Sequence, residues 1–121
     1  MAELVYLATP YSDPDPQVRE NRFREVNRAA AELMSQGVLV FSPISHTHPI
    51  LLAGDLPKGW EYWEKFDRAM LKACCRLIVL MQPGWSTSKG VTAEIAIATQ
   101  MGLPIEFLRR LRHGWRGAAE T

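Results

Sequence analysis

The sequence predicts an α/β fold with a single doubly wound parallel sheet of four to five strands and helices on both faces. Short apolar runs alternate along the chain with longer segments whose apolar residues recur at helical spacing. The apolar runs are continuous rather than alternating, which is typical of strands buried on both faces of a parallel sheet. Right-handed crossovers between such strands place helices on both sides of the sheet.

Four apolar runs are expected to form the strands. They cover residues 4–8, 38–41, 76–81 and 103–108. Each run is short and is flanked by turn-forming residues or by a helical segment, as expected for a buried strand. No internal repeat or linker divides them, so we expect residues 1–108 to form one domain.

The first helix has clear start and stop signals. It is expected to begin at Asp15-Pro16, because aspartate caps a helix and proline fits the first helical position. Gly37 supplies its C-terminal stop. Further helices are expected over residues 60–73 and 89–101.

Two segments are expected to be irregular. Residues 42–59 are rich in proline, histidine and glycine, and only residues 50–52 are compatible with a short helix. Residues 109–121 are expected to form a frayed, solvated basic tail rather than a phosphate contact. The arginines of this tail are Arg109, Arg110, Arg112 and Arg116.

The composition indicates an ordinary globular protein and excludes several classes. Hydrophobic residues make up 47% and charged residues 22% of the 121 residues, and the net charge of +1 gives no indication of a nucleic acid polymer or an anionic membrane as partner. No apolar run approaches the roughly 18 residues of a membrane span. Because the N-terminus lacks a basic signal-peptide region and the two cysteines are adjacent, we expect a reduced, cytoplasmic protein.

Polar residues gather in the loops that follow the predicted strands. These loops cover residues 9–14, 42–48 and 82–89. In parallel sheets of the flavodoxin or Rossmann type, ligands bind beyond the carboxyl ends of the strands, where the strand order reverses. The fold therefore predicts where the site lies, although it does not predict the chemistry.

Two carboxylates lie in or beside the apolar stripes of their helices. Glu94 lies near the amino end of the third helix, beside the apolar stripe and among small and apolar residues; it either complements the helix dipole or has a functional role. Asp67 lies between Trp63 and Met70 on the buried stripe of the second helix. A buried carboxylate must be hydrogen-bonded or neutralised, so Asp67 is either a structural hydrogen-bond acceptor or a ligand-facing acid with a perturbed pKa.

A pair of carboxylates at one pocket suits the cleavage of a glycosidic bond. One of them stabilises or attacks the sugar carbon while the other handles the proton of the leaving group. The segment from Ser88 to Gly90, with Lys89 between them, begins the third helix and suits an anionic group, because backbone N–H groups point outward there. Helix capping by Ser88 explains this segment equally well.

The sequence gives little indication of a metal or cofactor. His46 and His48 lie two residues apart without a further histidine or cysteine cluster, so we expect no metal and favour ligand hydrogen bonding. Neither a GxGxxG segment nor a P-loop is present, and we expect no cofactor.

Several of these segments resemble the nucleoside 2-deoxyribosyltransferase superfamily. The run Tyr-Leu-Ala-Thr-Pro at residues 6–10 resembles its first strand and loop, and Ser-x-Gly-Val-x-x-Glu at residues 88–94 resembles its nucleophile segment. The latter spacing is most similar to the deoxynucleoside 5′-monophosphate N-hydrolase branch. Together with Asp67 and Gly84-Trp85, the pattern resembles an uncharacterised bacterial and phage group of the superfamily. The resemblance covers roughly residues 5–107.

The resemblance implies roles for individual residues. Glu94 would be the nucleophile that forms a deoxyribosyl-enzyme ester, Asp67 would assist departure of the base or orient the sugar, and Tyr6 would line the pocket and hydrogen-bond Glu94. Superfamily members commonly form homodimers or higher homo-oligomers that complete each other's sites. The residues expected to contact the substrate are Thr9, Ser12, His46, Trp85, Ser86, Ser88, Lys89 and Gly90.

The resemblance also bears on the substrate. Transferases that act on free nucleosides tend to carry an aspartate at the position of Ser88, whereas the monophosphate hydrolases carry serine, so a phosphorylated substrate is favoured. Thr9 departs from the glycine that is usual there. Arg19 and Arg22 are either further phosphate contacts or part of a solvated helix face.

We therefore expect an N-glycosidase that hydrolyses the base–sugar bond of (deoxy)nucleoside 5′-monophosphates. A nucleoside 2-deoxyribosyltransferase and a non-catalytic nucleotide-binding or sensor module on the same fold are the alternatives. Trp60, Trp63 and Trp85 are expected near the pocket, where they either stack on a base or form a dimer face or core.

Overall fold

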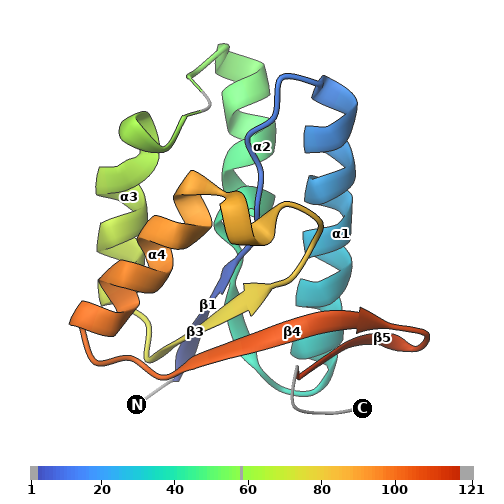
Figure 1. Cartoon of the computed structure of the whole chain (residues 1–121), viewed down its shortest axis with the longest axis vertical. Helices are drawn as coiled ribbons and strands as arrows, with labels where there is room; N and C mark the ends of the chain where they lie inside the picture. Colours follow the sequence, from blue (N-terminus) through green and yellow to red (C-terminus); the bar gives the residue numbers. More distant parts are fainter. Residues whose placement is uncertain (1–2, 58, 118–121) are drawn as a thin grey trace.

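Five strands form one mixed sheet in the computed structural model, which describes residues 3–57 and 59–117. Their order is β2-β1-β3-β4-β5, so β1 has β2 on one side and β3 on the other (Figure 1). The first four strands are parallel and β5 is antiparallel to β4. The strands are β1 (Leu4–Ala8), β2 (Leu39–Phe41), β3 (Arg76–Leu80), β4 (Ile105–Leu111) and β5 (Gly114–Gly117).

Helices connect the parallel strands, and their caps explain where they begin. The Asp15 side chain accepts a hydrogen bond from the N–H of Gln17 at the start of α1, and the Ser88 side chain accepts one from the N–H of Val91 at the start of α4. The expected boundaries of these two helices are therefore confirmed to within a residue or two. The helical elements are α1 (Pro16–Ser35), α2 (Pro43–Gly54), α3 (Trp60–Lys72), η1 (Trp85–Thr87) and α4 (Lys89–Gln100).

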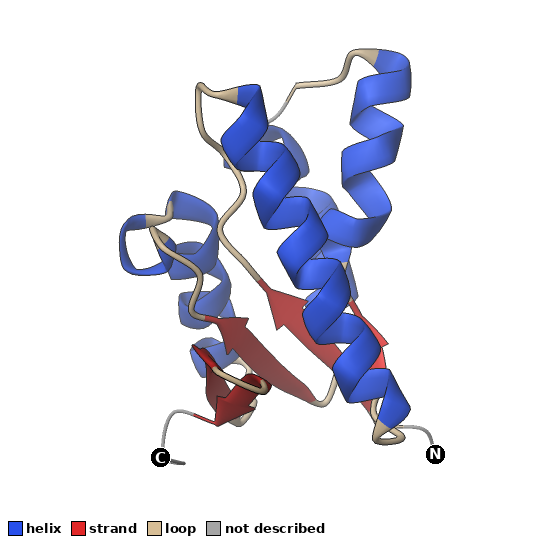
Figure 2. Cartoon of the chain, turned by 90° about the vertical axis from the view of Figure 1, so that its right-hand side faces the viewer, coloured by secondary structure: helices blue, strands red, loops and turns tan. Residues whose placement is uncertain are grey.

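Each face of the sheet has its own hydrophobic core. Val5 and Leu7 of β1 point to the face that α1 covers, while Tyr6 and Ala8 point to the opposite face under α3 and α4. Figure 2 shows the long helix α1 on the near side of the sheet. Because β1 is buried on both faces, it reads as a continuous apolar run, as the sequence predicted.

The segment after β2 is more regular than we expected. Instead of a short helix around residues 50–52, α2 covers Pro43–Gly54. Pro43 fits the first turn, where no backbone N–H is needed, and Thr47, His48 and Leu51 are buried at helical spacing. The tertiary contacts of this buried side outweigh the proline inside the helix, which local composition could not indicate.

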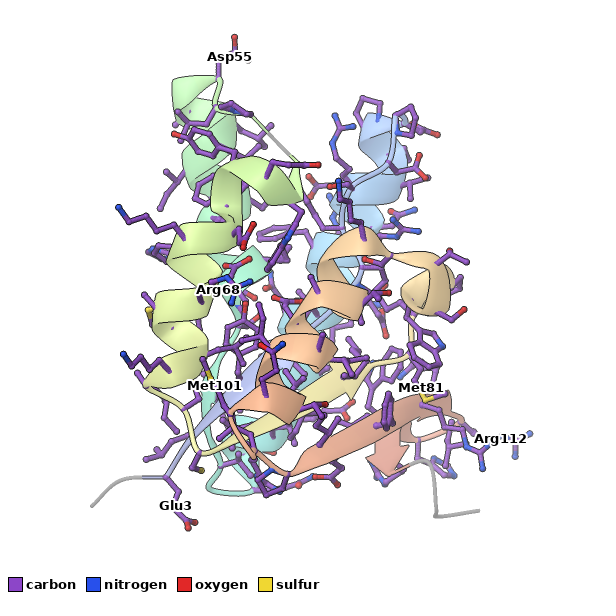
Figure 3. All side chains as sticks on the ribbon, turned by 60° about the vertical axis from the view of Figure 1, so that its left-hand side comes forward. Glu3, Asp55, Arg68, Met81, Met101 and Arg112 are labelled. Atoms are coloured by element: carbon purple, nitrogen blue, oxygen red, sulfur yellow. The ribbon has the colours of Figure 1, made fainter. Side chains whose placement is uncertain are left out.

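The expectation of a frayed basic tail is wrong for residues 109–117. β4 continues to Leu111, and β5 returns along it as an antiparallel edge strand, so the sheet is mixed rather than purely parallel. The indole N–H of Trp115 donates to Glu25 (2.9 Å) and its backbone N–H donates to Glu32 (3.0 Å), both on α1. Figure 3 shows Arg112 at the turn between the strands, pointing outward. Residues 118–121 lie outside the described part.

None of the helices in the described part of the chain combines the length and the hydropathy that crossing a bilayer requires.

Candidate active site

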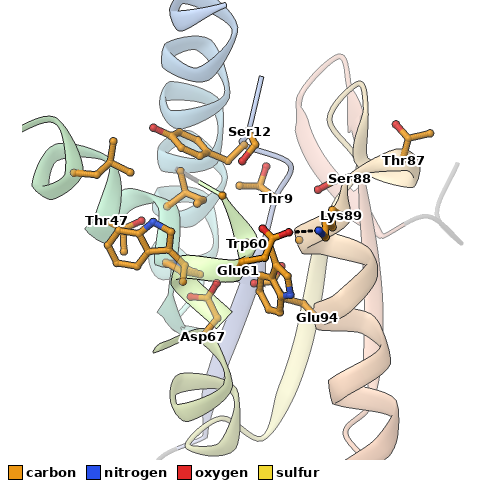
Figure 4. Close-up of a pocket in the computed structure, with 17 residues that line it drawn as sticks. Thr9, Ser12, Thr47, Trp60, Glu61, Asp67, Thr87, Ser88, Lys89 and Glu94 are labelled. Atoms are coloured by element: carbon orange, nitrogen blue, oxygen red, sulfur yellow. Dashed lines mark hydrogen bonds and ion pairs between the residues drawn. The ribbon is translucent and has the colours of Figure 1, made fainter. Parts of the chain in front are cut away.

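A pocket of about 320 Å³ opens at the edge of the sheet where the parallel strands end (Figure 4). The segments that follow β1, β2 and β3 all contribute to its lining, together with the first two turns of α3. A volume of this size lies at the small end of the range for ligand pockets, roughly 300–1,000 Å³. The described lining residues are Thr9, Tyr11, Ser12, Pro43, Ile44, Thr47, Leu51, Gly59, Trp60, Glu61, Trp63, Asp67, Thr87, Ser88, Lys89, Gly90 and Glu94.

Asp67 and Glu94 line the same pocket, and Tyr6 lies next to them. Asp67 extends from α3 and Glu94 from α4 (Figure 4). The Tyr6 hydroxyl donates a hydrogen bond to Oε2 of Glu94, as expected from the resemblance. Tyr6 itself is fully buried and is not among the residues that line the pocket. Asp67 is close enough that its charge raises the pKa of Tyr6, whereas Tyr6 lowers the pKa of Asp67.

Burial perturbs the protonation of this cluster. Desolvation and, to a smaller extent, the nearby charge of Asp67 raise the pKa of Glu94 to about 8, although the hydrogen bond from Tyr6 opposes the rise. Desolvation also raises the pKa of Asp67 to about 7, again opposed by Tyr6. The pKa of Tyr6 is raised well above its usual value by burial and by both carboxylates, so its hydroxyl keeps its proton.

The two carboxyl groups consequently share a proton near neutral pH. Like charges in one desolvated site resist ionising together, and such a pair titrates as a unit. The pKa of Glu94 lies above that of Asp67, so the shared proton lies mainly on Glu94. An ionised Glu94 beside a protonated Asp67, the combination of a nucleophile and a general acid, is the other singly protonated form of the pair, and the hydrogen bond from Tyr6 favours the ionisation of Glu94.

The amino end of α4 forms the opposite part of the lining. Because the Ser88 oxygen accepts from Val91 N–H at 3.2 Å, its own O–H proton remains available for donation. Gly90 lies close to the Trp60 ring, which is 3.8 Å from the position of a β-carbon at residue 90. The Nζ of Lys89 is paired with the Glu61 carboxylate of α3, and this ion pair is drawn as a dashed line in Figure 4.

Apolar side chains form the wall contributed by α2 and α3. Trp60 and Trp63 come from the first turn of α3, and Ile44 and Leu51 come from α2. The indole N–H of Trp63 donates to the carbonyl of Pro57 at 2.8 Å, which fixes the ring. This wall offers flat aromatic and aliphatic surface to a planar, apolar ligand group.

Three of the expected substrate contacts do not line the described pocket. His46 is exposed and stacks on Phe66, with ring centroids 5.9 Å apart. Trp85 packs on Phe107 at 5.5 Å, and Ser86 is exposed in η1. His46 lies on α2, where its ring faces Phe66 of α3 rather than the pocket, and the sequence did not reveal this full helix. The expected contacts that do line it are Thr9, Ser12, Ser88, Lys89 and Gly90.

Tyr11 lines the pocket and belongs to a buried polar network that the sequence did not reveal. Its hydroxyl lies 2.5 Å from Nδ1 of His48, whose Nε2 lies 3.1 Å from a carboxylate oxygen of Glu20. Since a carboxylate only accepts, Nε2 donates to Glu20, and in neutral His48 the Nδ1 atom accepts from Tyr11. The network joins the loop after β1 to α2 and α1, and so it fixes one side of the pocket.

Arg19 and Arg22 hold the loops in place and do not line the pocket. Arg22 donates to the carbonyls of Ser12 (3.2 Å) and Pro83 (3.0 Å), which follow β1 and β3 respectively. Arg19 donates to the carbonyl of Asp13. Their guanidinium groups therefore organise the backbone around the pocket, and the interpretation of these arginines as phosphate contacts has no support in the geometry.

Within residues 3–57 and 59–117, no three His, Cys, Asp or Glu side chains come together in a group suited to a metal ion.

Comparison with known proteins places the chain in a family. No curated protein matches the sequence. The family described as "Domain of unknown function (DUF1937)" matches residues 3–109, which include β1, β2, β3, most of β4 and every described residue that lines the pocket. The chain belongs to the DUF1937 family.

Proposed function

We propose that this protein is an N-glycosidase that hydrolyses the base–sugar bond of (deoxy)nucleoside 5′-monophosphates, with Glu94 as nucleophile. The observation that carries the proposal is that Asp67 and Glu94 line one pocket, with Glu94 hydrogen-bonded by Tyr6. Two carboxyl groups with raised pKa values, one of them hydrogen-bonded by a phenol, suit a reaction in which positive charge develops on a sugar ring.

The proposed reaction has two steps. As the C1′–N bond breaks, its electron pair goes to the base, which takes the proton of Asp67, and the Glu94 carboxylate forms an ester with C1′. Water then attacks C1′ and gives a proton to the Asp67 carboxylate while the ester bond returns its electrons to Glu94. The products are the free base and the sugar 5-phosphate, and both carboxyl groups regain their starting states.

The lining supports one orientation of the substrate. The sugar would lie between Glu94 and Asp67, and the base would lie against the apolar wall of Trp60 and Trp63. The phosphate would then lie at the amino end of α4, where Ser88 and the backbone N–H groups are available. A planar base requires flat apolar surface, and this indole pair offers such a surface in the lining.

The experiment incubates the full-length protein with the natural nucleosides and their 5′-monophosphates and separates released base by chromatography. Glu94→Ala is expected to abolish base release, with Glu64→Ala, a partly exposed glutamate of α3 paired with Arg68, as control. Base release at the wild-type rate by Glu94→Ala would contradict the proposal. Exchange with an added second base would assign transfer instead of hydrolysis, and nucleotide binding without turnover would assign a binding module.

The proposal includes the setting in which the enzyme works. We propose that the parallel part of the sheet is doubly wound in the flavodoxin or Rossmann manner, and that the protein is cytoplasmic and homodimeric. The two free thiols, Cys74 and Cys75, support a reducing compartment. Sedimentation of the purified protein tests the dimer.

A further inference from the structure

An ion pair joins the amino ends of two helices across the lining of the pocket. Glu61 lies in the first turn of α3 and Lys89 is the first residue of α4, and the side chain of each lines the pocket (Figure 4). Glu61 and Lys89 are 69% and 71% exposed, so solvent reaches the pair freely. An exposed ion pair contributes little to stability, and its partners exchange readily for others.

This pair decides the charge that the pocket offers to a ligand. Lys89 is the only lysine, arginine or histidine among the described lining residues, whereas Glu61, Asp67 and Glu94 are all acidic. The hydrogen bond from Lys89 lowers the pKa of Glu61, so Glu61 is ionised at neutral pH. The charge of Lys89 is therefore already neutralised before any ligand arrives.

We infer that Glu61 is a specificity-determining residue that competes with the anionic group of a ligand for Lys89. The inference rests on the proposed substrate class, a phosphorylated nucleoside, but it does not require turnover. A phosphate that binds Lys89 must displace the Glu61 carboxylate and then lies near a like charge. A neutral nucleoside leaves the ion pair intact. Glu61 thus lowers the factor by which the pocket prefers phosphorylated over unphosphorylated ligands.

Removal of the Glu61 charge tests this competition. We would measure the Kd values of deoxynucleoside 5′-monophosphates and of the corresponding nucleosides by calorimetry, in a Glu94→Gln background that prevents consumption of the ligand. Adding Glu61→Gln is expected to tighten monophosphate binding by roughly three- to tenfold, because an ion pair no longer has to be broken, and to change nucleoside binding by less than about twofold. Adding Lys89→Met instead is expected to weaken only monophosphate binding.

The control is Glu64→Gln, which removes a charge from the same helix at a position outside the pocket lining and should leave both Kd values unchanged. The inference is overturned if Glu61→Gln leaves monophosphate binding unchanged or weakens it, if both ligands gain equally, or if no monophosphate binds. A selective gain in the absence of any base release by the wild-type protein would support the role of Glu61 while refuting hydrolysis. The binding measurements therefore test the role of Glu61 independently of the test of hydrolysis.

Discussion

The hydroxyl of Tyr6 donates a hydrogen bond to Glu94, which lies 88 positions later in the chain. Tyr6 is on the central strand β1, where it is completely buried, and Glu94 is in the second turn of α4. The bond connects the hydrophobic core directly to the pocket. The orientation of Glu94 is therefore set by the most rigid part of the fold rather than by a loop.

Removal of this hydroxyl should reduce activity without disturbing the fold. Tyr6→Phe keeps the ring in its buried site and removes only the donor to Glu94. Since hydrogen bonds to charged groups are worth about 1.5–3 kcal/mol, base release should fall roughly 10- to 100-fold. The hydrogen bond lowers the pKa of both carboxyls, so its loss should move the acid limb of the pH–rate profile to higher pH. A pH–rate profile identical to that of the wild type would contradict a role for Tyr6 in the site.

The pH–rate profile should be bell-shaped with its optimum near neutrality. At low pH both carboxyl groups are protonated and the nucleophile is lost, while at high pH both are ionised and the general acid is lost. The pKa values of Asp67 (about 7) and Glu94 (about 8) lie close together. The two limbs of the profile therefore report the titration of the coupled pair rather than of either residue alone.

Asp67→Asn separates the two limbs. The alkaline limb should disappear because the general acid is gone, whereas the acid limb should persist as the ionisation of Glu94 alone, because Asp67 is uncharged on that limb. Rates of base release between pH 4 and 10 would be measured for this variant, with Glu64→Gln as the unaffected control. An alkaline limb that persists in Asp67→Asn would assign the acid to another group.

Glu94 should destabilise the folded protein at high pH. Its folded pKa of about 8 lies above the unfolded value near 4.5, so the folded state binds more protons, and stability falls as the pH rises through this window. Glu94→Gln removes that dependence, and its gain in stability over wild type should be small at pH 5 and on the order of a few kcal/mol at pH 8.5. Thermal unfolding followed by circular dichroism checks this; a gain that does not depend on pH would contradict it.

Trp115 should be important for folding although it lies in the basic C-terminal segment. The side chain is buried against α1, and replacing a buried tryptophan with alanine costs about 3–5 kcal/mol. Urea unfolding of Trp115→Ala should show this loss, while Tyr62→Ala, at a residue that is 52% exposed, should change the free energy of unfolding by less than about 1 kcal/mol. Equal effects of the two substitutions would place Trp115 at the surface in solution.

Local signals account for the parts of the fold that the sequence predicted. Asp15 and Ser88 cap their helices, and Gly37, with a φ of 88°, ends α1, so the boundaries are encoded within a few residues. Long-range contacts account for the parts of the fold that the sequence did not predict. β5 is held against the molecule because Trp115 donates hydrogen bonds to Glu25 and Glu32 on α1. In the sequence Trp115 stands among arginines, and this basic composition indicated a solvated tail instead.

The same distinction applies to the candidate site. Asp67 and Glu94 were recognisable because Asp67 interrupts an apolar helix stripe and Glu94 lies beside one, which are local signals. Glu61 and Tyr11 were not, because their roles depend on Lys89 and His48, which approach them from other elements. His46 was misplaced because its direction depends on the extent of α2.

The guanidinium of Arg22 holds the loops after β1 and β3 at once, and Gly84 leaves the space that it occupies. A β-carbon at Gly84 would lie 2.6 Å from Nη2 of Arg22, and the φ of 94° at Gly84 is strained for other residues. The positive φ alone disfavours any other residue at position 84, and a β-carbon there would also displace the guanidinium that holds both loops. A substitution at Gly84 would therefore disturb the mouth of the pocket although the glycine itself is not part of the lining.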